Sequence, residues 1–316
     1  MKITARIKKI FLILFIVAFQ LIIVVKFPGP VFGLDITANI STNTTWTSAD
    51  SPIHLKGNYA VNSGVMLTFD CSSGSINFLS DGNYTFTING TLNTTNCDAT
   101  NFVTFKHNTA TAVNSWAGIY ITSTGSGTFN FAKILYTDVG IRNKAGTLTV
   151  NDSTFETNNI GISSYNNSTI TTNRNTFNKQ TYAPIVIEPE IGTVTLGSAG
   201  NADILGTDSN KNGYNAIGIS YPGSDDANAA SACASDLCTI PQRTFAGISN
   251  IPYLMIFTYT FQGSNDTLQI DAGVIIKFRI NVTFTVQSGA KVDINGTSGN
   301  EVYFTSERDD AIGGDT

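Results

Sequence analysis

The sequence at residues 139–162 reads VGIRNKAGTLTVNDSTFETNNIGI, which begins and ends on the same triplet of an aliphatic residue, Gly and Ile. Its Ile recurs in steps of 22, 21 and 23 residues at Ile119, Ile141, Ile162 and Ile185, preceded by Gly in the first three copies and by Pro184 in the fourth. Two further apolar positions keep pace with it, one at Ile134, Phe155 and Phe177, the other at Phe129, Leu148 with Val150, Ile170, and Val194 with Leu196. Short apolar segments at a fixed period predict a parallel β-solenoid, because only stacked coils can bury them.

The residues between these apolar positions favour strands over helices. Thr, Asn, Ser and Gly fill them and are poor in helix interiors, whereas the Ile, Val and Phe of the repeat are typical of strands. Turn residues such as Asn143, Asn158 and Asn166 fit as well, since Asn tolerates the left-handed conformation. We therefore expect an all-β fold, a parallel β-helix with about 22 residues per coil.

Three segments carry a resemblance to a known superfamily. They are Val139-Gly-Ile141, Asn151-Asp-Ser-Thr-Phe155 followed by Asn158-Asn-Ile-Gly-Ile162, and Thr171-Thr-Asn-Arg-Asn-Thr-Phe177. This pattern resembles right-handed parallel β-helix proteins of the pectin-lyase-like superfamily, most closely the branch found in bacterial and archaeal surface proteins. The resemblance implies the right-handed fold. It implies no single activity, because the fold carries lyases, hydrolases, adhesins and stalks.

The N-terminal segment, residues 1–33, is predicted to direct export. Four basic residues precede an apolar run over residues 10–25, which is short compared with the roughly 20 residues of a membrane-spanning helix. We favour a cleaved signal peptide, and the alternative is an uncleaved N-terminal membrane anchor. Both place the remainder of the chain outside the cytoplasm, secreted or at the cell surface.

The remainder divides into four predicted sections. Residues 34–115 form a β-rich opening section that caps the solenoid, and residues 116–222 hold its regular coils. Residues 223–242 are small, polar and without period, so we expect a loop or linker. Residues 243–316 are predicted to begin a second large β-helix repeat and to leave it incomplete, as in a fragment of a longer protein.

Short sequence matches at an offset of about 200 residues support that second repeat. Leu67-Thr-Phe-Asp resembles Leu268-Gln-Ile-Asp, and Ile88-Asn-Gly-Thr resembles Ile294-Asn-Gly-Thr.

Composition excludes one class of partner and suggests disulfides. Only 13% of residues are charged and the net charge is −5, so we expect no nucleic-acid partner. Four cysteines in an exported chain suggest the two most local pairs, Cys71 with Cys97 and Cys233 with Cys238, among three possible pairings. Free thiols in a reducing host are the alternative.

Acidic residues gather at the end of the sequence. Asp309, Asp310 and Asp315 lie beside Gly313-Gly314, and Glu307 is near. Because Ca²⁺ binds several oxygen ligands in flexible loops, these residues are a candidate calcium site, the only cofactor that the sequence suggests. The spacing differs from that of an EF-hand, and a polar turn is the alternative.

Catalytic candidates are few. Asp225-Asp226 could act as an acid and base pair, but adjacent carboxylates in a loop are more typical of a solvated turn. A lyase would need a basic residue opposite an acidic face, for which the candidates are Arg142, Lys144, Arg174 and Lys179 with Asp138, Asp152 and Glu156. The aromatic residues that could stack on sugar rings are Trp46, Trp116, Tyr165, Tyr182 and Tyr221. His54 and His107 are expected to be structural or solvent-facing rather than catalytic.

Two functions remain open. The first is a non-enzymatic exported repeat protein that serves as an adhesin or scaffold or binds a cell-wall or extracellular polysaccharide. The second is a polysaccharide lyase or glycoside hydrolase acting along the solenoid. Uncharged Asn and Thr ladders on the faces would favour the first function, and charged residues converging on one face in neighbouring coils would favour the second.

Overall fold

The structure is a computed structural model that describes residues 33–188, 193–197, 200–219, 233, 236–287, 289–314 and 316. Residues 33–316 form one compact unit. The predicted leader lies outside the described residues except for Gly33. In the part of the chain that the structure describes, no helix has the length and apolar character needed to cross a membrane.

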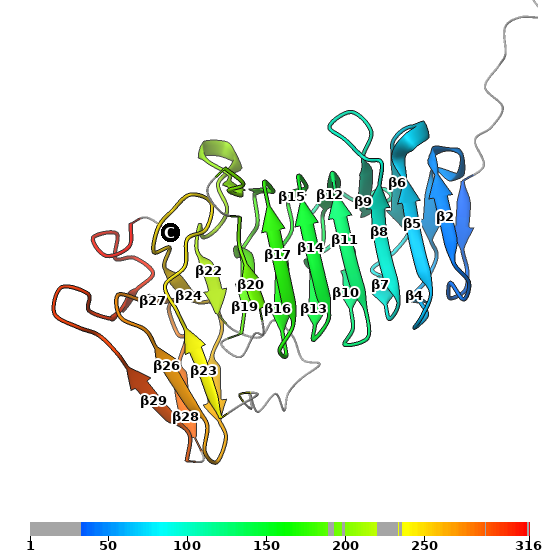
Figure 1. Ribbon diagram of the computed structural model, residues 1–316. Helices are drawn as coiled ribbons and strands as arrows, with labels where there is room; N and C mark the ends of the chain where they lie inside the picture. Colours follow the sequence, from blue (N-terminus) through cyan, green and yellow to red (C-terminus); the bar gives the residue numbers. More distant parts are fainter. Residues whose placement is uncertain are drawn as a thin grey trace, which may run out of the picture. The chain divides into compact units, whose positions relative to one another are not determined.

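The compact unit is a parallel β-solenoid of about 10 turns, with coils about 25 residues apart (Figure 1). Three parallel sheets, which we name A, B and C, run along it. Sheet A contains β1 (Leu34–Ile36), β3 (Ile53–Leu55), β6 (Ile76–Ser80), β9 (Val103–His107), β12 (Ala132–Leu135), β15 (Thr154–Glu156), β18 (Thr176–Asn178) and β21 (Ile204–Leu205). Sheet C contains β2 (Thr44–Thr47), β5 (Met66–Asp70), β8 (Thr91–Thr95), β11 (Ser126–Asn130), β14 (Thr147–Asn151), β17 (Thr169–Asn173) and β20 (Thr193–Thr195).

Sheet B is the longest and continues where the other two end. It contains β4 (Tyr59–Val61), β7 (Thr85–Ile88), β10 (Gly118–Ile121), β13 (Val139–Lys144), β16 (Ile160–Tyr165), β19 (Ala183–Ile187), β22 (Ile217–Ile219), β24 (Tyr253–Met255), β27 (Ile275–Phe278) and β30 (Tyr303–Ser306). Two small sheets accompany its last strands, one of β23 (Leu237–Ile240), β26 (Thr267–Ile270) and β29 (Lys291–Ile294), the other of β25 (Tyr259–Gln262) and β28 (Phe284–Gln287). The described part also has three short 3-10 turns, Ser48–Asp50, Cys71–Ser73 and Asp208–Asn210.

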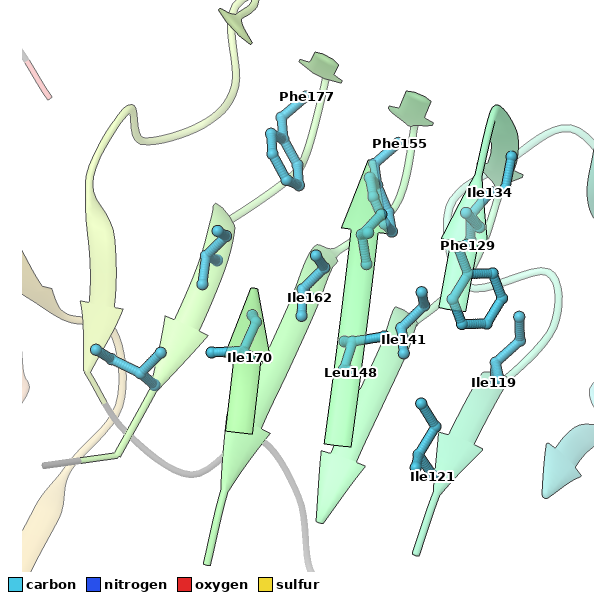
Figure 2. Close-up of a cluster of buried hydrophobic side chains, with 14 of the residues drawn as sticks. Ile119, Ile121, Phe129, Ile134, Ile141, Leu148, Phe155, Ile162, Ile170 and Phe177 are labelled. Carbon is cyan, nitrogen blue, oxygen red and sulfur yellow. The ribbon is translucent and has the colours of Figure 1, made fainter. Parts of the chain in front are cut away.

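The core consists of apolar columns that follow the period of the sequence. Ile119, Ile141, Ile162 and Ile185 are register partners along sheet B, as predicted. Ile134, Phe155 and Phe177 pair in the same way along sheet A. These side chains are fully or almost fully buried. Figure 2 shows all of them except Ile185 labelled, pointing into the interior of the coils. Each contributes roughly 1.5–3 kcal/mol through removal of apolar surface from water.

The glycine of the repeated triplet is explained by close packing between coils. A Cβ at Gly140 would lie 2.5 Å from the carbonyl oxygen of Gly161, and one at Gly161 would lie 2.5 Å from that of Pro184. Only a residue without a side chain lets successive strands of sheet B approach at this point.

Buried side chains hold the corners between the sheets. The Asn158 Oδ1 accepts hydrogen bonds from the Thr137 backbone N–H at 2.9 Å and from its hydroxyl at 2.8 Å. At the corner between sheets C and A, the Ser153 N–H donates to Asn175, and the Asn175 N–H donates to Asp203. Each coil thus satisfies buried donors of the coil before it.

Residues 34–115 form coils of the same three sheets, because β7, β8 and β9 pair with β10, β11 and β12. The first coil, which contains the short strands β1 and β2, covers the N-terminal end of the solenoid. In this coil the side-chain oxygens of Asn39 and Asn43 accept hydrogen bonds from the backbone N–H groups of Ala60 and Met66 in the next coil.

The predicted linker over residues 223–242 is only partly described. Its end is not a loop: β23 pairs with β26 and buries Cys238 and Ile240. The alternation of these two buried side chains in a four-residue segment was too short to distinguish from the polar sequence before it.

Residues 243–316 continue sheet B, since β24 pairs directly with β22. Two matched tetrapeptides occupy different sheets: Ile88 ends β7 in sheet B, whereas Ile294 ends β29 in a small sheet. The match between Ile88-Asn-Gly-Thr and Ile294-Asn-Gly-Thr therefore reflects a shared Asn-Gly sequence after a strand. The two segments do not occupy equivalent positions in their coils.

Both cysteine pairs are joined. Disulfides connect Cys71 with Cys97 and Cys233 with Cys238. The first links the 3-10 turn after β5 to the segment after β8, so it ties two successive coils together.

Candidate functional site: a groove at one corner of the coils

Three successive turns between sheets C and A each place one residue in the left-handed conformation at the same position of the coil. Phe131, Asp152 and Arg174 follow the last residues of β11, β14 and β17 and have φ values of 51°, 52° and 56°. The left-handed conformation costs a residue with a Cβ roughly 1–2 kcal/mol. Hydrogen bonds between coils hold it here, since the Phe131 N–H donates to the Asn151 carbonyl and the Asp152 N–H to the Asn173 carbonyl.

A groove of about 300 Å³ lies over these turns, and we call it the corner groove. Its lining residues come from four successive coils and comprise Asp98, Ala99, Phe102, Phe131, Ala132, Lys133, Asp152, Thr154 and Arg174. Strands of one sheet lie about 4.8 Å apart, so four coils span roughly 14 Å. The groove thus offers room for a short segment of an extended ligand.

Arg174 is held by several partners in this groove. Its Nε and Nη2 donate to the two carboxylate oxygens of Asp152 at 2.6 and 2.7 Å, and its Nη1 donates to the side chain of Asn201 at 2.6 Å. The hydrogen bond to Asp152 raises the pKa of Arg174. These hydrogen bonds orient the guanidinium along the groove lining and favour its protonated form.

The groove lining also combines aromatic and charged groups. The Lys133 Nζ lies 3.6 Å from the ring centroid of Phe102, a cation–π contact. The Asp98 Oδ1 accepts from the Thr100 hydroxyl and from the backbone N–H groups of Thr100 and Asn101, with the hydroxyl the main cause of its lowered pKa. Asp98 is therefore an anion at neutral pH.

Three of the basic lyase candidates form ion pairs with acidic candidates, Arg174 and Lys179 between successive coils and Arg142 within one coil. Besides Arg174 with Asp152, Lys179 lies 3.6 Å from Glu156. Arg142 lies 3.7 Å from Asp138. Of these residues, the corner groove brings together only Arg174 and Asp152. Asp225 and Asp226 lie outside the described residues.

The two histidines lie on β3 and β9, which β6 separates in sheet A, and they serve different local structures. The His54 Nδ1 lies 3.0 Å from the Asp81 Oδ1, and Lys56 pairs with the other oxygen of the same carboxylate. Burial would raise the pKa of Asp81, but the hydrogen bonds from His54 and Lys56 outweigh burial and lower it. The His107 Nδ1 accepts from the backbone N–H groups of Thr109 and Ala110 in a turn.

Most predicted stacking residues are core residues. Trp46, Trp116 and Tyr165 are buried, and the Trp116 Nε1 donates to the Leu135 carbonyl at 2.8 Å. Tyr182 contacts Phe257 and Arg279, and Tyr221 is not described. The half-buried Phe102 and Phe131 of the groove were missed. The signal for Phe131 was its place directly after Asn130, which matches Asp152 after Asn151 and Arg174 after Asn173.

The acidic C-terminal loop surrounds a lysine. Lys277 is fully buried, and its Nζ donates to the carbonyl oxygens of Asp309 at 2.8 Å and Gly314 at 2.6 Å. The Asp309 carboxylate accepts from the Thr305 hydroxyl and the Ala311 N–H. Asp315 is not described, and among the described residues no three His, Cys, Asp or Glu side chains gather as metal ligands.

A larger hollow of about 420 Å³ lies beside β27 and β30, next to Phe278, Arg279 and Phe304. Its walls come mainly from two neighbouring strands and the turns that follow them. The corner groove is the stronger candidate, because side chains from four coils converge there.

Comparisons with known protein families, with curated proteins and with solved structures find no match for this chain. The β-solenoid itself is therefore what the structure establishes, and the superfamily remains a resemblance.

Proposed function

We propose that the protein is an exported β-helix that binds an extracellular or cell-wall polysaccharide in the corner groove without cleaving it. The predicted leader supports export. The observation that carries the proposal is the combination of half-buried Phe102 and Phe131 with fixed polar groups in one groove. Aromatic rings flanked by hydrogen-bonding groups are well suited to sugar rings.

The state of the charged groups favours binding over turnover. A hydrolase needs one carboxyl group that keeps its proton. The pKa of Asp98 is lowered, and Asp152 accepts two hydrogen bonds from Arg174. A lyase needs an available base, and the Asp152 contact raises the pKa of Arg174. Lyase or hydrolase activity is the alternative that the experiment must exclude.

Binding and turnover of the purified chain on neutral and acidic polysaccharides test the proposal, with Ca²⁺ and with a chelator. We expect retention without new reducing ends and without the ultraviolet absorbance of unsaturated product. Release of either product would overturn it. Absence of retention on every polysaccharide would overturn it as well.

Two aromatic residues of one coil give a matched pair of variants. Phe131 and Tyr136 flank β12, have φ values of 51° and 65°, and only Phe131 lines the groove. Asn accepts this backbone conformation better than either ring. We expect Phe131→Asn to weaken polysaccharide binding about three- to tenfold, the size of a lost ring contact. Tyr136→Asn should leave binding unchanged.

A further inference from the structure

The outer face of sheet C carries two columns of hydroxyl and amide side chains in register. One column is Thr91, Ser126, Thr147, Thr169 and Thr193, and the other is Asn93, Thr128, Thr149, Thr171 and Thr195. We call these ten residues the threonine face. They are half-buried or exposed. Figure 1 shows β8, β11, β14 and β17 running side by side in this sheet.

The threonine face is a two-dimensional array of hydrogen-bonding groups. Neighbouring strands place equivalent side chains about 4.8 Å apart, and alternate residues of one strand lie about 6.6 Å apart. Each Thr hydroxyl both donates and accepts hydrogen bonds. Branching at Cβ restricts χ1, so that hydroxyls and methyls repeat from coil to coil.

Hydrogen bonds between coils fix the spacing of this array. The Asn173 Nδ2 donates to the Asn151 Oδ1 at 2.8 Å, and the Asn151 Nδ2 donates to the Asn130 Oδ1 at 2.9 Å. This ladder runs along the ends of β11, β14 and β17. Beneath the face, Leu148 and Ile170 are fully buried register partners. The array is therefore built on a rigid support.

The chemistry of the face excludes several partners. None of its ten residues is charged, so it offers nothing to a polyelectrolyte, and none is aromatic, so it offers no ring to a sugar. What remains is a regular surface of uncharged donors and acceptors interspersed with methyl groups. The partner that matches it is itself uncharged, periodic and able to donate and accept at every site.

We propose that the threonine face binds ice. Water molecules hydrogen-bonded to hydroxyls at these repeats would be ordered in two dimensions, as the oxygens of an ice surface are. Such a layer can merge with an ice surface without further ordering of the protein. A single charged side chain would disrupt this match, because its hydration shell is not ice-like. The site is separate from the corner groove and does not depend on polysaccharide binding.

Ice recrystallisation and the shape of single ice crystals in solutions of the full chain test this inference. Thr171 and Thr176 lie on successive strands of one coil, and both face outward, Thr171 from sheet C and Thr176 from sheet A. We expect wild type and Thr176→Lys to shape ice. Thr171→Lys should need at least about tenfold more protein for the same effect. Equal circular dichroism spectra would show that both variants are folded.

Several results would overturn the inference. Wild type that leaves ice crystals unshaped would do so, as would equal losses in Thr171→Lys and Thr176→Lys. Retention on crystalline cellulose that Thr171→Lys abolishes and Phe131→Asn does not, without any effect on ice, would assign the face to a solid polysaccharide instead. Phe131→Asn separates the two proposals, since it should weaken polysaccharide binding and leave ice shaping intact.

Discussion

The outer faces of sheets A and C differ although the same coils build both. Along sheet A, one outward column runs Asn77, Thr104, Lys133, Thr154 and Thr176, and a second contains Leu135, Glu156 and Asn178. Along sheet C, the column from Thr91 to Thr193 contains only hydroxyl side chains. The inner columns of both sheets are apolar almost throughout. Stacking thus constrains the inside of each coil, whereas the outside can change from coil to coil or repeat a single chemistry.

The largest expected effect comes from the core that both faces share. Phe155 is fully buried and stacks on Phe177 with ring centroids 5.0 Å apart. Phe155→Ala should lower the free energy of unfolding by about 3–5 kcal/mol. Chemical denaturation measures this change. Thr149→Ala on the outer face is the control and should stay within about 0.5 kcal/mol of wild type. Equal losses would contradict the distinction between inside and outside.

The corners between the faces come next. Asn158→Ala leaves the N–H and the hydroxyl of Thr137 without their acceptor, which should cost about 1–3 kcal/mol. Asn159→Ala is a control at the adjacent residue, where the half-buried side chain donates to Asp138. A difference in unfolding midpoint between the two variants is expected. Identical midpoints would show that the buried amide does not hold the corner.

Asp203, at the corner that joins the two faces, should make stability depend on pH. Burial raises its pKa, although Thr172 and Asn175 donate to the carboxylate. The folded state therefore holds the proton more tightly than the unfolded chain. Its contribution is present below the unfolded pKa and is lost as pH rises through the folded pKa.

The variant that tests this dependence is Asp203→Asn. Its unfolding free energy should stay within about 1 kcal/mol of wild type in acid, since an amide oxygen can accept the same N–H bond. As pH rises above the acidic range, wild type should lose unfolding free energy and Asp203→Asn should not. Parallel pH profiles for the two proteins would contradict the assignment.

The smallest effect concerns the charges of sheet A. Glu156 lies 3.6 Å from Lys179, and both side chains are about two-fifths exposed, at 40% and 44%. Glu156→Gln should change the free energy of unfolding by less than about 1 kcal/mol, and by less still in high salt. A larger effect in thermal unfolding would mean that the charged face supports the fold. A small change in the free energy of unfolding would mean that the charges of this face contribute little to stability.

The sequence was most informative where the coils bury side chains. The register of Ile119, Ile141 and Ile162 was predicted from their spacing alone, because each must stack on the next to leave water. The period was less uniform than predicted. Register partners Phe86 and Ile119 are 33 residues apart, and Ile217 and Tyr253 are 36 apart, so that the average rises to about 25. The extra residues form loops between strands that still stack on one another. Such loops have no apolar period, so their length could not be predicted from the repeat.

The corner groove was harder to predict. Arg174 and Asp152 were candidates on composition, but their mutual contact depends on two turns that place them one above the other. Phe102 and Phe131 resembled ordinary apolar residues of the repeat. Phe131 lines the groove because its backbone is in the left-handed conformation. That conformation is uncommon for an aromatic residue, so the sequence did not predict it.

The disulfide between Cys71 and Cys97 has a mechanical consequence. Coils of a solenoid contact only their neighbours, so tension on the N-terminal end would peel them away one at a time. The bond joins the segments after β5 and β8, in successive coils, and a peeling front that arrives there meets a covalent link instead of hydrogen bonds. The segment between the two cysteines, residues 72–96, would carry no tension and could not add its length to the extended chain while the disulfide is intact.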